Sequence, residues 1–225
     1  MGAKQHTFTE KYGFRNLLFF LLLYIFGSPF LANFPSLAIL AHLCLSISLL
    51  LSVYAINQEQ GYRTTAMIFL LPVLVLYWCA IYNLIGSGRI YSYILLSVYL
   101  GLLVFTFAAQ ISKFKTVTLN TIIATLCLYL VIGLFWGALY ALLYEVVPGS
   151  YSGALLENTE GNKFNLFIYF SIVTLTTLGY GDITPQTLEA SSLCQLEAIV
   201  GQFFTAVVIA WLVGSYASAK EKNKQ

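Results

Sequence analysis

Charged side chains are scarce in this sequence. Asp, Glu, Lys and Arg make up only 9% of its 225 residues, whereas 59% are hydrophobic. A soluble domain averages about 25% charged residues, so this composition predicts a membrane protein. The net charge is only +2, which gives no reason to expect a nucleic acid as a partner.

Features that enzymes and cofactor sites need are also missing. The four cysteines fall inside apolar stretches without metal-ligand spacing, and we expect them to pack as small apolar residues. No nucleophile–base pair, metal-ligand set or phosphate loop is found, so we expect neither enzyme activity nor a cofactor. A cleavable signal peptide is missing too, because the first apolar run ends at residues 27–29 without a small-residue cleavage pattern.

Long apolar runs are abundant. A helix needs about 20 mainly apolar residues to cross a bilayer, and six segments qualify. They are residues 14–33, 36–56, 64–86, 90–112, 117–146 and 189–215. A seventh run, 164–176, is too short to cross and is better explained as a re-entrant helix that is buried in protein or lines water. The sequence therefore predicts an all-α membrane protein with six transmembrane helices plus this re-entrant pore helix.

The basic residues indicate the orientation. With six crossings and an inside N-terminus, nine of the eleven Lys and Arg residues lie on the inner side, in agreement with the positive-inside rule. These nine are Lys4, Lys11, Arg15, Arg63, Lys113, Lys115, Lys220, Lys222 and Lys224. We therefore expect an integral protein of the plasma (inner) membrane with both termini in the cytoplasm. The 147–188 segment then lies outside, where Glu157, Glu160 and Asp182 attract cations.

A glycine motif follows the re-entrant run and suggests a selectivity-filter loop. It reads Thr177, Leu178, Gly179, Tyr180, Gly181 and Asp182. A potassium ion must exchange its water shell for closely spaced oxygens, and the carbonyls of the first four motif residues, with the Thr177 hydroxyl, can supply them. Successive carbonyls on one side need unusual dihedrals, which Gly179 and Gly181 adopt without a Cβ penalty. We expect Leu178 and Tyr180 to wedge the filter against the re-entrant helix. Asp182 is placed to brace the filter and add negative potential at the outer mouth.

The run from Tyr169 to Pro185 resembles the pore loop of tetrameric potassium channels. Leu178 replaces the commonest valine, a change that keeps the carbonyl. The resemblance implies K+ selectivity over sodium and K+ binding at Thr177 to Gly181. It implies a pore domain over 117–215, with pore helix 164–176, filter 177–182 and inner helix 189–215. Because the motif occurs once per chain, a four-fold filter requires a homotetramer.

The last span contains further candidates. Gly201 is mid-helix, and the resemblance implies a gating hinge there, while close helix packing explains a small residue equally well. Gln202, Thr205 and Ile209 share one face, which by analogy with channel inner helices lines a water-filled cavity. Glu197 is an intramembrane carboxylate, for which we consider a filter brace or pH sensor and a hydrogen-bonded packing residue. The run around it also resembles inner helices of small prokaryotic potassium channels.

The first four spans resemble the layout of voltage-gated channels but lack a charged sensor. The fourth span has no charged residue, whereas each charge moved contributes about 2.3 kcal/mol per 100 mV. We therefore predict a four-span domain (1–112) without steep voltage gating, followed by a linker (113–116). Lys113 and Lys115 are candidates for contact with anionic lipid. The segment 216–225 is expected to be a short cytoplasmic tail without a ligand-binding domain.

The prediction that best fits these features is a potassium-selective channel subunit that conducts K+ passively. A potassium transporter subunit remains an alternative, although such proteins carry four degraded filters with single glycines in one chain. A non-selective cation channel is a second alternative, although it normally lacks the filter tyrosine or the second glycine. Both are retained here.

Overall fold

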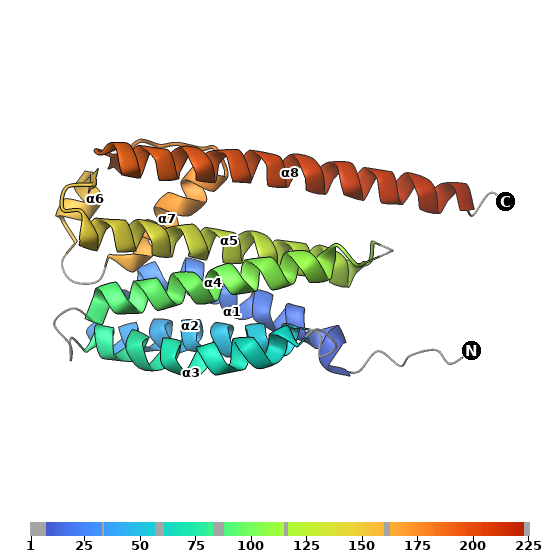
Figure 1. Ribbon diagram of the computed structural model, residues 1–225, viewed down its shortest axis with the longest axis horizontal. Coiled ribbons are helices and arrows are strands. Elements are labelled where there is room, and N and C mark those ends of the chain that lie inside the picture. The colour runs from blue at the N-terminus through green and yellow to red at the C-terminus, as the bar shows by residue number, and fades with distance from the viewer. Residues whose placement is uncertain are drawn as a thin grey trace.

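The computed structural model describes residues 8–32, 34–56, 61–82, 88–114, 117–159 and 163–222 (Figure 1). The elements are α1 (Phe8–Ala32), α2 (Pro35–Ala55), α3 (Tyr62–Ile81), α4 (Gly88–Ile111), α5 (Leu119–Val146), β1 (Tyr151–Ser152), α6 (Ala154–Glu157), α7 (Phe164–Leu175), β2 (Thr184–Pro185) and α8 (Leu188–Lys222). Six of these helices are long and apolar enough to cross a membrane. The prediction of an all-α membrane protein is therefore confirmed for the described part of the chain.

Helix boundaries differ from the predicted spans in several places. Pro29 lies inside α1, as membrane helices tolerate when neighbouring groups compensate for the missing N–H. Pro35 is the first residue of α2, a position where its missing N–H would have no partner within the helix. Helix α3 ends at Ile81, earlier than predicted. Helix α8 continues to Lys222, so the helix extends past its predicted end at residue 215.

The helices form layers around α5. Figure 1 shows α1–α4 on one side of α5 and α8 on the other, with the short α7 tilted between α5 and α8. Helix α7 packs against α5, α8 and α1. The start of α1 and the end of α8 lie at the same end of the bundle, as an even number of crossings requires. This arrangement holds the re-entrant helix between a buried helix and an outer one.

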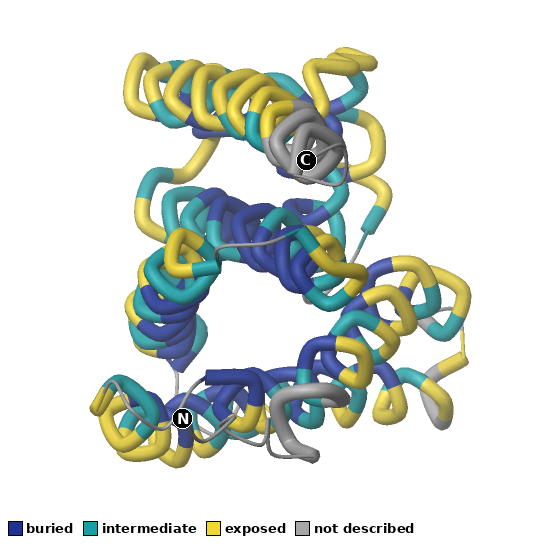
Figure 2. The backbone as a smooth tube through the Cα atoms, turned by 90° about the vertical axis from the view of Figure 1, so that its right-hand side faces the viewer, coloured by how far each residue is buried: buried dark blue, intermediate teal, exposed yellow. Residues whose placement is uncertain are grey.

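Burial differs sharply between α5 and α8. In their apolar spans, 61% of the α5 residues are buried, but only 11% of the α8 residues. Helix α5 contacts α1, α4, α7 and α8, whereas the main contacts of α8 are with α7, α5 and β2. Figure 2 shows exposed residues along most of the described length of α8. A long apolar helix exposed on this scale needs lipid or another protein chain to cover it.

Helix α4 has no row of charges. Arg89 is the only charged residue between Gly88 and Ile111. Its guanidinium lies 3.4 Å from the Glu145 carboxylate on α5, and both side chains are partly exposed. An exposed ion pair of this kind contributes about 0–1 kcal/mol, so it ties α4 weakly to the end of α5. The helix therefore lacks the charge that a voltage sensor must move.

Candidate functional site

The pore helix α7 is held by aromatic packing. Phe167 and Phe170 lie 5.5 and 5.7 Å, between ring centroids, from Tyr151 in β1, and Phe170 lies 5.1 Å from Tyr140 in α5. Aromatic residues are mediocre helix formers in isolation, so these contacts rather than propensity stabilise α7. Burial in the same cluster raises the pKa of the Tyr151 hydroxyl well above its ordinary value, so this hydroxyl stays neutral.

The glycine motif has an alternating backbone. Thr177, Gly179 and Gly181 have φ values of 59°, 59° and 76°, and the two residues between them do not share this positive φ. In an ordinary strand successive peptide groups point to opposite sides. Alternation between left-handed and ordinary residues cancels this effect, so we expect successive carbonyls to turn toward the same side. The glycines adopt such values without strain, as predicted.

Thr177 was not expected to share this conformation. It is the only non-glycine residue with positive φ in the described part of the chain. A side chain in the left-handed region costs about 1–2 kcal/mol, and its persistence indicates that neighbouring contacts impose it. Sequence reasoning missed it because threonine carries no preference for this region.

Hydrogen bonds fix which way the motif faces. The Thr177 N–H donates to the Thr174 carbonyl at 2.9 Å, and the N–H groups of Leu178 and Gly179 donate to the Val173 carbonyl at 3.0 and 3.4 Å. Three successive donors thus point back to the C-terminal end of α7. Among the described residues, no donor reaches the carbonyl oxygens of Thr177–Gly181. These oxygens are available to a ligand on the side away from α7.

The chain leaves the motif through a braced turn. The Tyr169 hydroxyl of α7 donates to Oδ2 of Asp182 at 2.5 Å, and the Ile183 N–H donates to Oδ1 at 3.1 Å. Strands β1 and β2 then pair antiparallel, and the Gln186 N–H donates to the Ser150 carbonyl at 2.8 Å. Asp182 therefore connects the end of the motif to the pore helix. The sequence suggested such a brace without identifying Tyr169 as its partner.

Leu178 and Tyr180 do not wedge the motif against α7 of the same chain, contrary to expectation. Their exposed fractions are 56% and 66%, and all residues from Thr176 to Gly181 are exposed. The reason is geometric, because the side of the motif that faces α7 is occupied by backbone hydrogen bonds. A surface outside this chain must cover these two side chains if they are to be buried.

Glu197 is completely buried and joins three helices. The Tyr140 hydroxyl of α5 donates to Oε2, and Oε1 makes a short hydrogen bond with the Ser171 hydroxyl of α7. The Ser171 hydroxyl also donates to the Gly133 carbonyl of α5 at 2.8 Å. A serine has one hydroxyl hydrogen, and a carbonyl can only accept. One hydrogen cannot serve both acceptors fully, so a neutral Glu197 acid that donates to Ser171 would complete this network.

Gly201 lies against the end of the pore helix. A Cβ added here would collide with the Leu175 carbonyl oxygen and lie 2.9 Å from the carbonyl carbon. Such an approach between two backbones is possible only without a side chain. Close packing therefore explains the glycine, and the role of Gly201 as a gating hinge stays a prediction.

Comparison with known proteins extends these observations. Residues 116–216 match the ion channel family. Potassium channel protein kcv of Paramecium bursaria Chlorella virus 1 is 32% identical over 80 residues, which are 35% of this chain and 84% of the viral protein. The chain belongs to the potassium channel family.

A human potassium channel protein also matches part of this chain. Potassium channel subfamily K member 17 of Homo sapiens is 38% identical over 76 residues, which are 32% of this chain but only 23% of the human protein. The family match begins at residue 116 and so leaves α1–α4 outside it.

The predicted cavity-lining residues of this family member are exposed. Gln202, Thr205 and Ile209 all lie on the exposed surface of α8, whereas Glu197 and Gly201 lie on its packed surface. The Thr205 hydroxyl donates to the Gly201 carbonyl at 2.9 Å. Of the predicted lipid contacts, Lys113 is exposed after the end of α4, and Lys115 lies outside the described residues.

Proposed function

We propose that this chain is a subunit of a potassium-selective channel that conducts K+ passively. The single observation that carries this proposal is the backbone of residues 177–181. Alternating positive φ values turn the carbonyls to one side, and three N–H groups of the motif donate hydrogen bonds to carbonyls at the end of α7. The resulting row of unpaired oxygens has the chemistry needed to replace the hydration shell of K+. Membership of the potassium channel family supports the same function.

A homotetramer is the assembly that this proposal requires. One chain contributes one row of carbonyls, whereas a dehydrated ion needs oxygens on all sides. The exposure of Leu178 and Tyr180 and of most of α8 leaves suitable surface for neighbouring copies. Rotational symmetry would bring four filter segments to one axis. Gln202, Thr205 and Ile209 would then line the water-filled cavity below them.

Two electrostatic features favour cations in such an assembly. The C-terminal end of α7 carries a partial negative charge of about half an electron, and four such ends would point toward the cavity. Asp182, oriented by Tyr169, would add negative potential at the outer mouth. In this orientation both termini are cytoplasmic, and Lys113 and Lys115 meet the anionic inner leaflet.

Gating by a steep voltage response is not part of the proposal. Only Arg89 in α4 carries charge, and it lies beside Glu145 at one end of the helix. Moving one such charge through the full field would contribute only about 2.3 kcal/mol per 100 mV per subunit. We therefore propose that open probability depends weakly on voltage.

Ion flux through liposomes tests the function. Purified full-length protein is reconstituted, and K+ and sodium efflux are measured separately, with and without barium. We expect K+ efflux that barium blocks and little sodium efflux. Equal fluxes of the two ions would instead identify a non-selective cation channel. Uptake that depends on a coupled ion would identify a transporter.

A further inference from the structure

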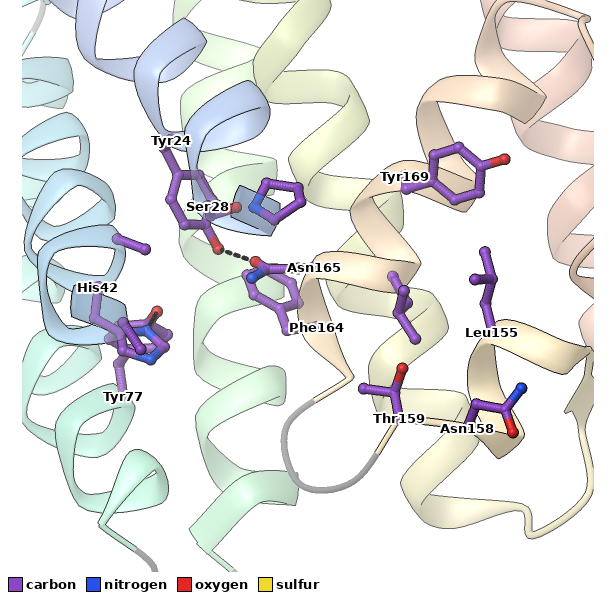
Figure 3. Close-up of a pocket in the computed structure, with 14 residues that line it drawn as sticks. Tyr24, Ser28, His42, Tyr77, Leu155, Asn158, Thr159, Phe164, Asn165 and Tyr169 are labelled. Atoms are coloured by element: carbon purple, nitrogen blue, oxygen red, sulfur yellow. Dashed lines mark hydrogen bonds between the residues drawn. The ribbon is translucent and has the colours of Figure 1, made fainter. Parts of the chain in front are cut away.

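A cavity lies between helices α1–α3 and the pore helix. Its volume is about 740 Å³, within the range of about 300–1,000 Å³ that is typical of small-molecule sites. Helices α1, α2 and α3 form one wall, and α6 and the first turns of α7 form the other (Figure 3). The cavity therefore lies between the part of the chain outside the family match and the element that supports the filter.

The lining determines which ligands fit. None of the described residues that line the cavity is Asp, Glu, Lys or Arg. Ala38, Ala41, Leu155 and Leu166 provide apolar surface, and hydroxyl, amide and imidazole groups provide polar contacts. A charged ligand would lose its hydration without gaining an ionic partner, which is costly. A neutral molecule with an apolar body and one hydroxyl group fits this mixture.

Two hydrogen bonds lie in the wall. His42 Nδ1 lies 2.7 Å from the Tyr77 hydroxyl, and this contact connects α2 with α3. The Tyr24 hydroxyl donates to Oδ1 of Asn165 at 3.0 Å (Figure 3) and connects α1 with α7.

His42 offers a hydrogen-bonding nitrogen to a ligand. In the neutral imidazole, Nε2 accepts when Nδ1 carries the hydrogen, and Nε2 donates when Nδ1 accepts from Tyr77. No hydrogen bond from another described residue to His42 Nε2 is found. A ligand hydroxyl can both donate and accept, so it can pair with Nε2 while its apolar part contacts the alanine and leucine side chains.

We infer that this cavity binds an uncharged, hydroxyl-bearing amphiphile that partitions into the membrane, and that Asn165 conveys its presence to the pore helix. Asn165 lies in the first turn of α7, and the other end of this helix accepts the hydrogen bonds of the filter. A ligand that repositions Tyr24 or Asn165 would shift α7 as a unit. The effect on current rests on the proposed function, whereas binding does not.

Photolabelling tests the binding site. Full-length protein in liposomes is irradiated with a diazirine-bearing octanol, and adducts are mapped by mass spectrometry. We expect saturable adducts on Tyr24, Tyr77 or Leu155 that 1-octanol competes away and octylammonium does not. Labelling that does not saturate, that is confined to lipid-facing residues, or that octylammonium suppresses equally would overturn the inference.

Matched variants locate the site and its coupling. Ala38→Phe fills part of the cavity, and Ile39→Phe places the same side chain on the neighbouring exposed position. We expect saturable labelling to fall about tenfold in Ala38→Phe, equivalent to about 1.4 kcal/mol, and to persist in Ile39→Phe. Equal labelling in both variants would contradict the site. Tyr24→Phe removes the hydrogen bond to Asn165, so labelling should persist while octanol loses its effect on K+ flux. An unchanged effect would contradict the coupling.

Discussion

Replacement of Glu197 tests the hydrogen-bond network behind the filter. If Glu197 is a neutral acid, it donates to Ser171 and accepts from Tyr140. Glutamine offers the same donor and acceptor in nearly the same shape. Alanine removes both groups and leaves the Tyr140 hydroxyl without its carboxyl partner. The two variants are therefore expected to differ strongly in stability.

The magnitudes follow from burial. The Glu197 side chain has an exposed fraction of 0%, so Glu197→Ala creates a cavity and costs about 2–5 kcal/mol, including about 1–3 kcal/mol for the unsatisfied hydroxyl. Glu197→Gln should cost only about 1 kcal/mol, because the amide carries one more hydrogen than the acid. K+ selectivity should persist in Glu197→Gln, because the Glu197 carboxyl is hydrogen-bonded to the side chains of Tyr140 and Ser171 rather than to the filter backbone. Any pH response of gating that depends on this acid should be lost.

Two assays examine this reasoning. Thermal unfolding of the purified variants gives the order of stability, and infrared difference spectra between the wild type and Glu197→Gln detect the carbonyl stretch of a protonated acid. A loss of stability in Glu197→Gln as large as in Glu197→Ala would refute the neutral acid. Carboxylate bands in place of the acid band would refute it as well. Altered selectivity in Glu197→Gln would contradict a role limited to support and gating.

Four further substitutions probe the filter and its supports. Gly181 has a φ of 76°, so Gly181→Ala costs about 1–2 kcal/mol in backbone strain. Both Gly181→Ala and Gly179→Ala should abolish selective current without preventing assembly. Unchanged selectivity in either variant argues against the filter assignment. Gly201→Ala should lower the unfolding temperature through overpacking of about 1–3 kcal/mol, and wild-type stability combined with altered gating would favour the hinge. Tyr169→Phe removes the hydrogen bond to Asp182, which contributes about 1.5–3 kcal/mol. A higher K+ concentration should then be needed to protect the filter against thermal unfolding. An unchanged K+ requirement would show that this hydrogen bond does not support the filter.

Local patterns in the sequence were sufficient to predict the apolar helices and the backbone of the glycine motif. Apolar length alone predicts six helices long enough to cross a membrane, because such helices satisfy their own backbone hydrogen bonds within a bilayer. The glycines at 179 and 181 predict positive φ values, since other residues rarely adopt them. The short apolar run before them predicts helix α7, whose observed end at Leu175 lies one residue from the prediction.

Contacts between distant segments were beyond sequence reasoning. Glu197 was recognisable as an intramembrane carboxylate, but its partners Tyr140 and Ser171 lie 57 and 26 residues away. The close approach of Gly201 to Leu175 depends on how α8 crosses α7, which no local pattern encodes. The cavity was missed for the same reason, because its walls come from five helices.

The reversal potential of single channels in mixed sodium and potassium solutions measures ion selectivity most directly. With K+ on one side of the bilayer and sodium on the other, a filter of unpaired carbonyls predicts a reversal potential that follows the K+ gradient. A reversal potential near zero in those solutions would mean that the filter passes both ions alike, and it would contradict potassium selectivity.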